Sequence, residues 1–181
     1  MAVEVAYADQ LDCCERLTVS VPCGAASVVM LGIGNVLLGD DGVGIQLVER
    51  LRSDPALSAV DFVDGGTLSF SLLGLIETTD ALLVADAADL NLVPGTVRLF
   101  ENEAMDRFLR SSRRRSVHEV GLCDLLDMAR LHDCLPERRA LLCVQPGTID
   151  WGETLSDRLA ETFESAVGQA RSVLGNWCFS S

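Results

Sequence analysis

The sequence predicts a three-layer α/β domain. Short apolar runs of strand length alternate along the chain with longer amphipathic segments, which is typical of a mostly parallel sheet covered by helices on both faces. The chain has 181 residues, of which 49% are hydrophobic, enough for one domain with its own core. We expect that domain over residues 27–181, preceded by a leader over residues 1–26 that is either disordered or an upstream extension.

Five strands are predicted from apolar runs that end in turn signals. The third stops at Asp86, and the fourth follows it after a Pro94-Gly95 turn. That connection is too short for a parallel crossover, so we expect the fourth strand to be an antiparallel neighbour. The runs cover residues 27–32, 60–63, 81–85, 96–100 and 140–144.

Five helices are predicted where apolar residues recur at intervals of three and four. Ser116 and Glu119 form a capping box at the start of the fourth helix, whose inward residues are Leu122, Leu125, Leu126 and Ala129. Gly175-Asn176 gives a stop for the last helix. The helical segments fall within residues 42–52, 72–76, 102–109, 116–129 and 157–174.

The charge and composition exclude several classes of protein. A formal net charge of −13 opposes phosphate backbones and anionic lipid, so we expect neither nucleic acid nor a membrane as partner. All 14 basic residues are arginine, which excludes Schiff-base and Ser–Lys chemistry and a P-loop lysine. The seven cysteines include no C-x-x-C pair, and the first 27 residues, with no basic start and no continuous apolar block, do not look like a secretion signal. We interpret the protein as cytoplasmic, with reduced thiols.

Three side chains far apart in the sequence form a candidate metal site. Sites in such sheets gather at the carboxyl ends of the parallel strands. Asp41 follows the first strand, Asp86 ends the third, and His118 lies in the first turn of the capping-box helix. Two carboxylates and an imidazole suit Ni, Zn, Mn or Fe, and the positive helix end favours the neutral, ligating form of the histidine.

Each of these residues also has a plain structural interpretation. Asp41 can cap the helix that begins near Gly42, Asp86 can bond turn amides, and His118 can be a polar residue at a helix start. The segment Asp64-Gly65-Gly66-Thr67 after the second strand can be an Asx turn.

Other functional patterns are weaker. The Gly32-Ile-Gly34 pair suggests a dinucleotide fingerprint, but Leu37 stands where its third glycine belongs. No nucleophile elbow is present, and Cys123 and Cys143 lie in apolar segments. The arginines between 107 and 115 are either a solvated loop or a docking surface for an acidic partner.

The ordered blocks LGIGNVLLGDDGVG, VDGGT, LLVADA, SVHEVGLCDLL and CVQP resemble the nickel–iron hydrogenase maturation protease family. That resemblance implies a five-stranded mixed sheet with one antiparallel strand. It also implies an aspartyl-type endopeptidase that removes a C-terminal tail from the precursor of the hydrogenase large subunit. By the same resemblance Asp41, Asp86 and His118 are the metal ligands.

The metal that this resemblance implies is Ni²⁺ carried by the substrate, with none resident in the enzyme. The second-loop residues Asp64, Gly65, Gly66 and Thr67 are expected to hold the substrate tail. No side chain is an obvious nucleophile, so we expect water to attack, with Asp41 or Asp64 accepting its proton. The alternative is a nickel-binding hydrogenase assembly factor that cuts nothing.

Overall fold

The computed structural model describes residues 26–67, 70–111 and 117–179. Residues 1–25 of the expected leader lie outside this part of the chain. The strands are β1 Val28–Gly32, β2 Val60–Asp64, β3 Ala81–Ala87, β4 Val97–Glu101 and β5 Arg138–Val144. The α-helices are α1 Val43–Arg52, α2 Leu73–Glu77, α3 Glu103–Ser111, α4 Val117–Leu131 and α5 Asp157–Phe179, and short 3₁₀ turns are η1 Gly39–Gly42, η2 Pro55–Leu57 and η3 Phe70–Leu72.

The five strands form one mixed sheet in the order β2-β1-β3-β5-β4, with β4 antiparallel to β5 and every other pair parallel. The predicted fold class and the single antiparallel strand are confirmed. The expectation that β4 would pair with the preceding strand is wrong, because β5 lies between them. Ala88 donates its backbone N–H to Val144 O, and Gly95 donates to Gln145 O, so the β3–β4 loop passes over the end of β5.

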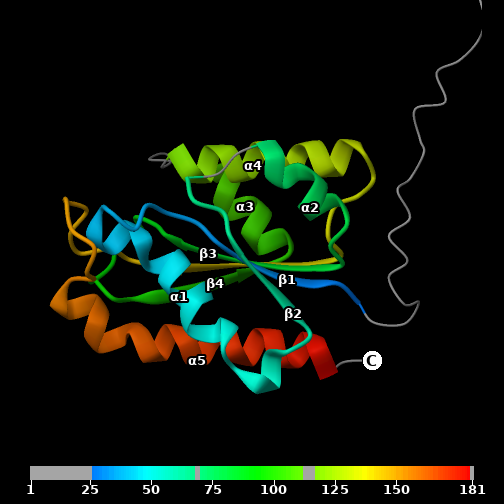
Figure 1. Ribbon diagram of the computed structural model, residues 1–181. Coiled ribbons are helices and arrows are strands. Elements are labelled where there is room, and N and C mark those ends of the chain that lie inside the picture. The colour runs from blue at the N-terminus through cyan, green and yellow to red at the C-terminus, as the bar shows by residue number, and fades with distance from the viewer. Residues whose placement is uncertain (1–25, 68–69, 112–116, 180–181) are drawn as a thin grey trace, which may run out of the picture.

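Helices cover both faces of the sheet and give the molecule three layers (Figure 1). α1 and α5 pack on one face, and α2, α3 and α4 pack on the other. Each face holds its own apolar cluster of buried side chains. The predicted inward residues of the fourth helix are all at most 2% exposed, so its predicted orientation is confirmed.

Several element ends differ from the sequence prediction by a few residues, and tertiary contacts explain two of these differences. β3 continues through Asp86 to Ala87, because both residues pair with β5. α5 runs past Gly175-Asn176 to Phe179. Trp177 and Cys178 pack against the core there, and the Arg138 guanidinium donates to Trp177 O at 3.3 Å. Tertiary packing therefore overrides the weak helix propensity of glycine.

Among the described helices, none has the length and apolar character that crossing a bilayer requires. Among the described cysteines, Cys123 and Cys143 are buried in the core, Cys134 is exposed and Cys178 is half-buried.

Candidate functional site

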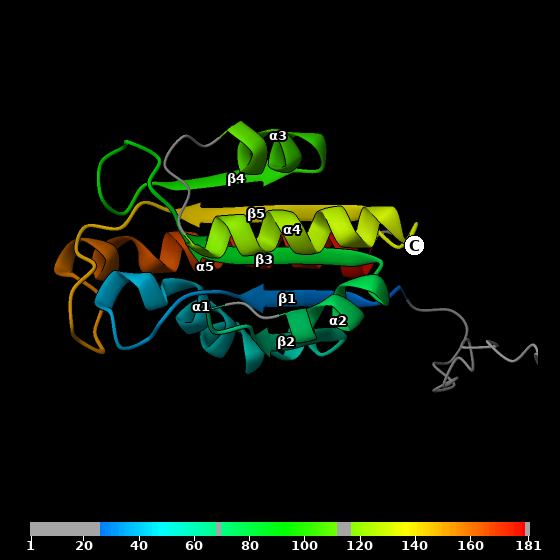
Figure 2. The same cartoon turned by 90° about the horizontal axis from the view of Figure 1, so that it is seen from above.

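The loops that carry the predicted site residues meet at the carboxyl ends of the parallel strands (Figure 2). Their close packing requires glycine. A Cβ on Gly44 would lie 2.2 Å from Ala85 O, so only a residue without a side chain lets the first turn of α1 approach the end of β3. Ile33 donates its N–H to the same carbonyl at 2.9 Å. This packing brings the segment containing Asp41 against the strand containing Asp86.

Asp41 lies in η1 and is 8% exposed. Its Oδ2 accepts the backbone N–H of Asn35 at 2.8 Å. α1 has Gly42 at its N-cap and no side-chain cap bond, so Asp41 does not cap this helix. A Cβ on Gly34, whose φ is +133°, would fall 1.8 Å from Asp41 O. The loop thus curls tightly around Asp41.

Asp86 is 2% exposed and belongs to the strand itself, with Cys143 as its pairing partner. Successive side chains of a strand point to opposite faces. Asp86 therefore shares a face with Leu82 and Val84, which belong to the cluster under α2, α3 and α4. The direction of its side chain is therefore set by its place in the sheet and not by a turn.

His118 is the second residue of α4, and its side chain lies outside the described part of the structure, as does Ser116 of the predicted capping box. α4 leads into β5, and its N-terminal end lies at the same edge of the sheet as the site loops (Figure 2). The helix start and Asp86 therefore share both a face and an end of the sheet.

Within the side chains that the structure describes, no three His, Cys, Asp or Glu gather closely enough to hold a metal ion. The ligand set of Asp41, Asp86 and His118 includes one side chain outside that search, and it stays a prediction. Its donors, two carboxylates and an imidazole, suit a divalent transition metal.

The segment Asp64-Gly65-Gly66-Thr67 leaves the end of β2. Asp64 Oδ1 accepts the N–H of Gly66 at 2.8 Å, which is the predicted Asx turn. Gly65 donates to Gly32 O and Gly34 donates to Gly66 O, both at 2.8 Å. The turn is therefore bound to the first loop, and the substrate-binding role predicted for these residues stays a prediction.

Asp40 is a residue whose importance the sequence did not reveal. Its side chain is fully buried, and its carboxylate accepts four hydrogen bonds from the β5–α5 loop. The donors are Gly147 N (2.8 Å), Thr148 N (2.9 Å), Ser156 N (2.7 Å) and Ser156 Oγ (2.8 Å). Burial alone raises the pKa of Asp40, but the bonds from Ser156, Thr148 and Gly147 outweigh it and hold the pKa below 3.8.

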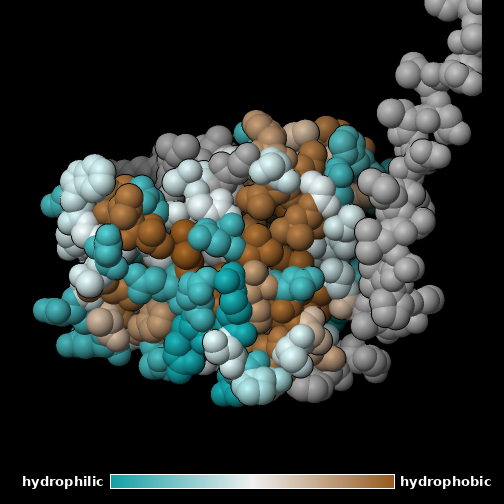
Figure 3. Space-filling view, in the orientation of Figure 1, coloured by the Kyte–Doolittle hydropathy of each residue, from teal (hydrophilic) through white to brown (hydrophobic). Residues whose placement is uncertain are grey.

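Large apolar side chains are exposed in the loops around these acids. The first loop and the β5–α5 loop are joined there, because Gly152 donates to Leu37 O at 3.0 Å and Gly39 donates to Gly152 O at 2.7 Å. Figure 3 shows apolar surface at this end of the molecule, over the segment between β1 and α1. The exposed residues are Val36 (39%), Leu37 (46%), Leu92 (41%), Val93 (63%), Ile149 (56%) and Trp151 (81%). Clustered exposed apolar residues are typical of a surface that binds another protein.

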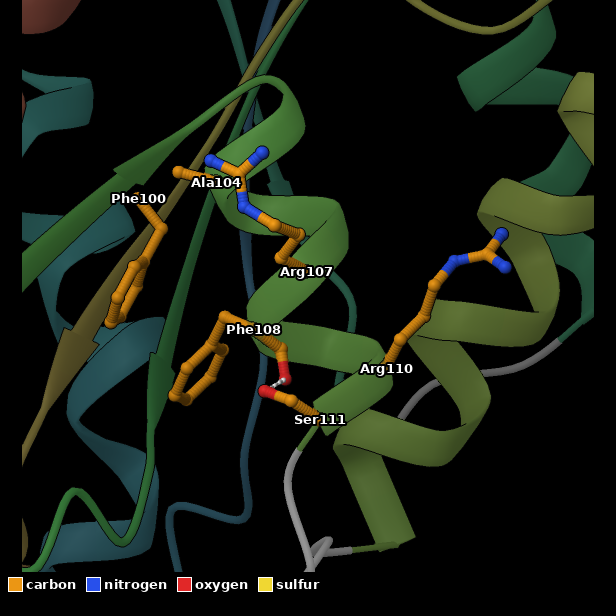
Figure 4. Close-up of a pocket in the computed structure, with 6 residues that line it drawn as sticks. All are labelled: Phe100, Ala104, Arg107, Phe108, Arg110 and Ser111. Atoms are coloured by element: carbon orange, nitrogen blue, oxygen red, sulfur yellow. Dashed lines mark hydrogen bonds between the residues drawn. The ribbon is translucent and has the colours of Figure 1, made fainter.

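A groove of about 650 Å³ lies away from this site, between β4 and α3 (Figure 4). The rings of Phe100 and Phe108 stack in it with centroids 4.3 Å apart. Arg107 pairs with Glu103, and Arg110 pairs with Asp127 on α4. Both described arginines of the basic segment are thus engaged by acids of the same chain, which favours the solvated-loop interpretation; Arg113, Arg114 and Arg115 lie outside the described residues.

Comparisons with known proteins agree with this arrangement. A family model described as hydrogenase maturation protease matches residues 45–173. The hydrogenase expression/formation protein HupD of Rhodobacter capsulatus is 36% identical over 152 residues, which cover 83% of this chain and 72% of that protein. The hydrogenase 2 maturation protease of Escherichia coli K12 is 30% identical and is matched over 90% of its length by 81% of this chain.

Solved structures give the same result. The hydrogenase maturating endopeptidase HybD from Escherichia coli superposes with a TM-score of 0.75 at 30% identity, over 82% of this chain and 91% of that one. A [NiFe] hydrogenase maturation protease HybD from Thermococcus kodakarensis gives a TM-score of 0.69 at 25% identity, over 82% and 99% of the two chains. The predictions of family and of enzyme class are confirmed, and this chain belongs to the hydrogenase maturation protease family.

Proposed function

We propose that the protein is an endopeptidase that removes the C-terminal tail of a nickel–iron hydrogenase large-subunit precursor after nickel has been inserted. The observation that carries the proposal is the pair of buried acids, Asp41 and Asp86, on segments packed together at the carboxyl ends of the strands. The family supports the reaction class, and this pair supports the proposal that the site lies at this end of the sheet.

The nickel of the substrate is the recognition mark in this proposal. Buried carboxylates are costly unless hydrogen bonds or a cation offset their charge. Asp41, Asp86 and His118 would hold the ion while it remains bound to the precursor. A precursor without nickel would lack this anchor, and its tail would stay uncut.

Water is the proposed nucleophile for cleavage. Its oxygen bonds to the scissile carbonyl carbon, the C–N bond breaks, and the leaving amine takes up a proton. Asp41 or Asp64 accepts the proton that the water loses. The segment Asp64-Gly65-Gly66-Thr67 holds the tail, with the exposed Asp64 at the edge of the site.

A polypeptide substrate also suits the surface around the acids. Leu37, Ile149 and Trp151 expose apolar area on two joined loops. Such side chains contact a protein partner more readily than a small polar substrate.

The test is incubation of the protein with the nickel-loaded precursor and with its nickel-free form, followed by mass measurement of the precursor. The proposal expects loss of the tail mass from the loaded form alone. Cleavage of both forms would refute nickel recognition. Nickel bound by the chain with no cleavage of either form would identify the non-enzymatic assembly factor instead.

A further inference from the structure

A single buried carboxylate joins two loops that lie far apart in the sequence. Asp40 belongs to η1, and all of its side-chain partners belong to the segment from Gly147 to Ser156, more than 100 residues later. Both oxygens are used: Oδ1 accepts Ser156 N, and Oδ2 accepts Gly147 N, Thr148 N and Ser156 Oγ.

The main chain strengthens this connection. Asp40 donates its own N–H to Thr148 O at 3.2 Å, and Gly39 donates to Gly152 O at 2.7 Å. The η1 turn is only four residues long, too short to be stable by itself. The β5–α5 loop therefore helps to hold this turn in place.

We propose that Asp40 is the positioning residue for Asp41, and that its contact with the β5–α5 loop sets where the Asp41 carboxylate lies. This inference rests on the proposed function, because Asp41 is the acid assigned there to nickel binding or proton transfer. The two residues are adjacent in η1, so a shift of Asp40 moves Asp41 with it. The hydrogen bond from the Asn35 N–H to Asp41 Oδ2 depends on that position, so a change in it can be used to detect a shift of Asp41.

The role requires a carboxylate and a small neighbour. Asparagine offers one acceptor oxygen and an NH₂ group, so an amide at position 40 leaves at least one of the four donors facing another donor. A Cβ on Gly147 would lie 3.4 Å from Asp40 Oδ2 and 3.3 Å from Ser156 Oγ. A side chain at position 147 would therefore crowd the contact between Asp40 and Ser156.

The test compares Asp40→Asn with Asp106→Asn. Asp106 is a matched control because it is also a largely buried acid with several donors, from Arg139 and Arg130, and it contacts the start of β5 at the opposite end of the sheet. Both variants are studied at a temperature where circular dichroism shows them folded. We expect Asp40→Asn to cut precursor about tenfold more slowly per folded molecule, and Asp106→Asn to cut at the wild-type rate.

A second readout does not depend on cleavage. In the ¹⁵N–¹H spectrum, the Asn35 amide should shift in Asp40→Asn and stay in place in Asp106→Asn, because that amide donates to Asp41. An unmoved Asn35 resonance in folded Asp40→Asn would overturn the inference, as would equal loss of cleavage in both variants. If the wild type cuts no precursor, the proposed function fails while the Asn35 shift still decides whether Asp40 positions Asp41.

Ser156→Ala supplies the milder variant should Asp40→Asn not fold. It deletes one of the four donors and keeps the carboxylate. We expect a smaller Asn35 shift in the same direction and a rate reduction of about twofold. No shift and no change in rate in this variant would count against the inference.

Discussion

At the scale of single residues, Asp40 and Asp41 show how two adjacent acids acquire different roles. Asp40 is surrounded by four donors from one loop, whereas Asp41 accepts a bond from the loop that precedes it. The sequence predicted Asp41 from its place after the first strand. It could not separate the two acids, because the partners of Asp40 are brought near only by folding.

Asp86→Asn tests the candidate ligand set. The change keeps the size of a side chain that is 2% exposed, so we expect the protein to fold while cleavage of the nickel-loaded precursor falls about 100-fold or more. His118→Ala should have the same effect. Circular dichroism and precursor mass are the measurements.

Asp80→Asn is the control, because Asp80 precedes the other end of β3, where its Oδ2 accepts Ser27 N. It should cut normally. Normal tail removal by Asp86→Asn and His118→Ala would discard the ligand assignment.

Asp106 makes the stability depend on pH. Burial raises its pKa, but the hydrogen bond and charge of Arg139 and the charges of Arg130 and Arg110 outweigh this, so its folded pKa lies below 3.8. A depressed folded pKa stabilises the protein above about pH 4, and that stability is lost as the pH falls through the folded value.

We therefore expect Asp106→Asn to lower the free energy of unfolding by about 2 kcal/mol at about pH 7, since it breaks a largely buried ion pair. The difference from wild type should shrink as the pH falls below the usual carboxyl range and through the lowered pKa of Asp106. Urea unfolding at neutral pH and over this lower range measures it. A difference that stays constant with pH would contradict this assignment.

At the scale of elements, periodicity predicted all five strands, the helices and the buried face of α4. It failed where contacts between residues far apart in the sequence determine where an element ends or which strand it pairs with. β3 extends through Asp86 because β5 lies beside it, and α5 passes Gly175 because Trp177 packs on the core. The prediction that β4 pairs with β3 was wrong. A short loop can also cross the end of a third strand, here β5, and place β4 on the far side of it.

The β5–α5 loop offers a prediction at this scale. Trp151 is 81% exposed, so Trp151→Ala should change the free energy of unfolding by less than about 0.5 kcal/mol. If the loop contacts the precursor, KM should rise about tenfold with little change in kcat. Cleavage rates over a range of precursor concentrations measure both constants.

Leu131→Ala is the matched control. Leu131 is 82% exposed, and it is the last residue of α4, at the end of that helix away from the candidate site. It should leave KM unchanged. Equal KM values for wild type and Trp151→Ala would remove this loop from the substrate surface.

At the scale of the whole molecule, the two faces of the sheet differ in character from its carboxyl edge. Its faces are covered by two apolar clusters, while its carboxyl edge gathers buried acids, glycine turns and exposed apolar loops. The rule that parallel strands place sites at this edge predicted that the candidate residues would gather at one end of the sheet, and their role stays a prediction. It could not predict which side chains hold the loops, since those contacts join residues 40 and 147–156.

We predict that the leader is dispensable. β1 begins at Val28, and residues 26–179 supply the five strands of the described sheet and an apolar cluster on each of its faces. Deleting residues 1–25 should leave the midpoint of thermal unfolding within about 2 °C of wild type. Far-UV circular dichroism against temperature is the measurement, and loss of folded protein on deletion would show that the leader packs into the core.

The bond between Asp40 and Ser156 has a consequence for biosynthesis. Ser156 lies just before the final helix, so a chain still attached to the ribosome lacks the donors for Asp40 until nearly all of it has been translated. A product that ends before Gly147 contains β1, β2 and β3 but none of the donors to Asp40, so we expect its η1 turn to lack the contacts that hold it.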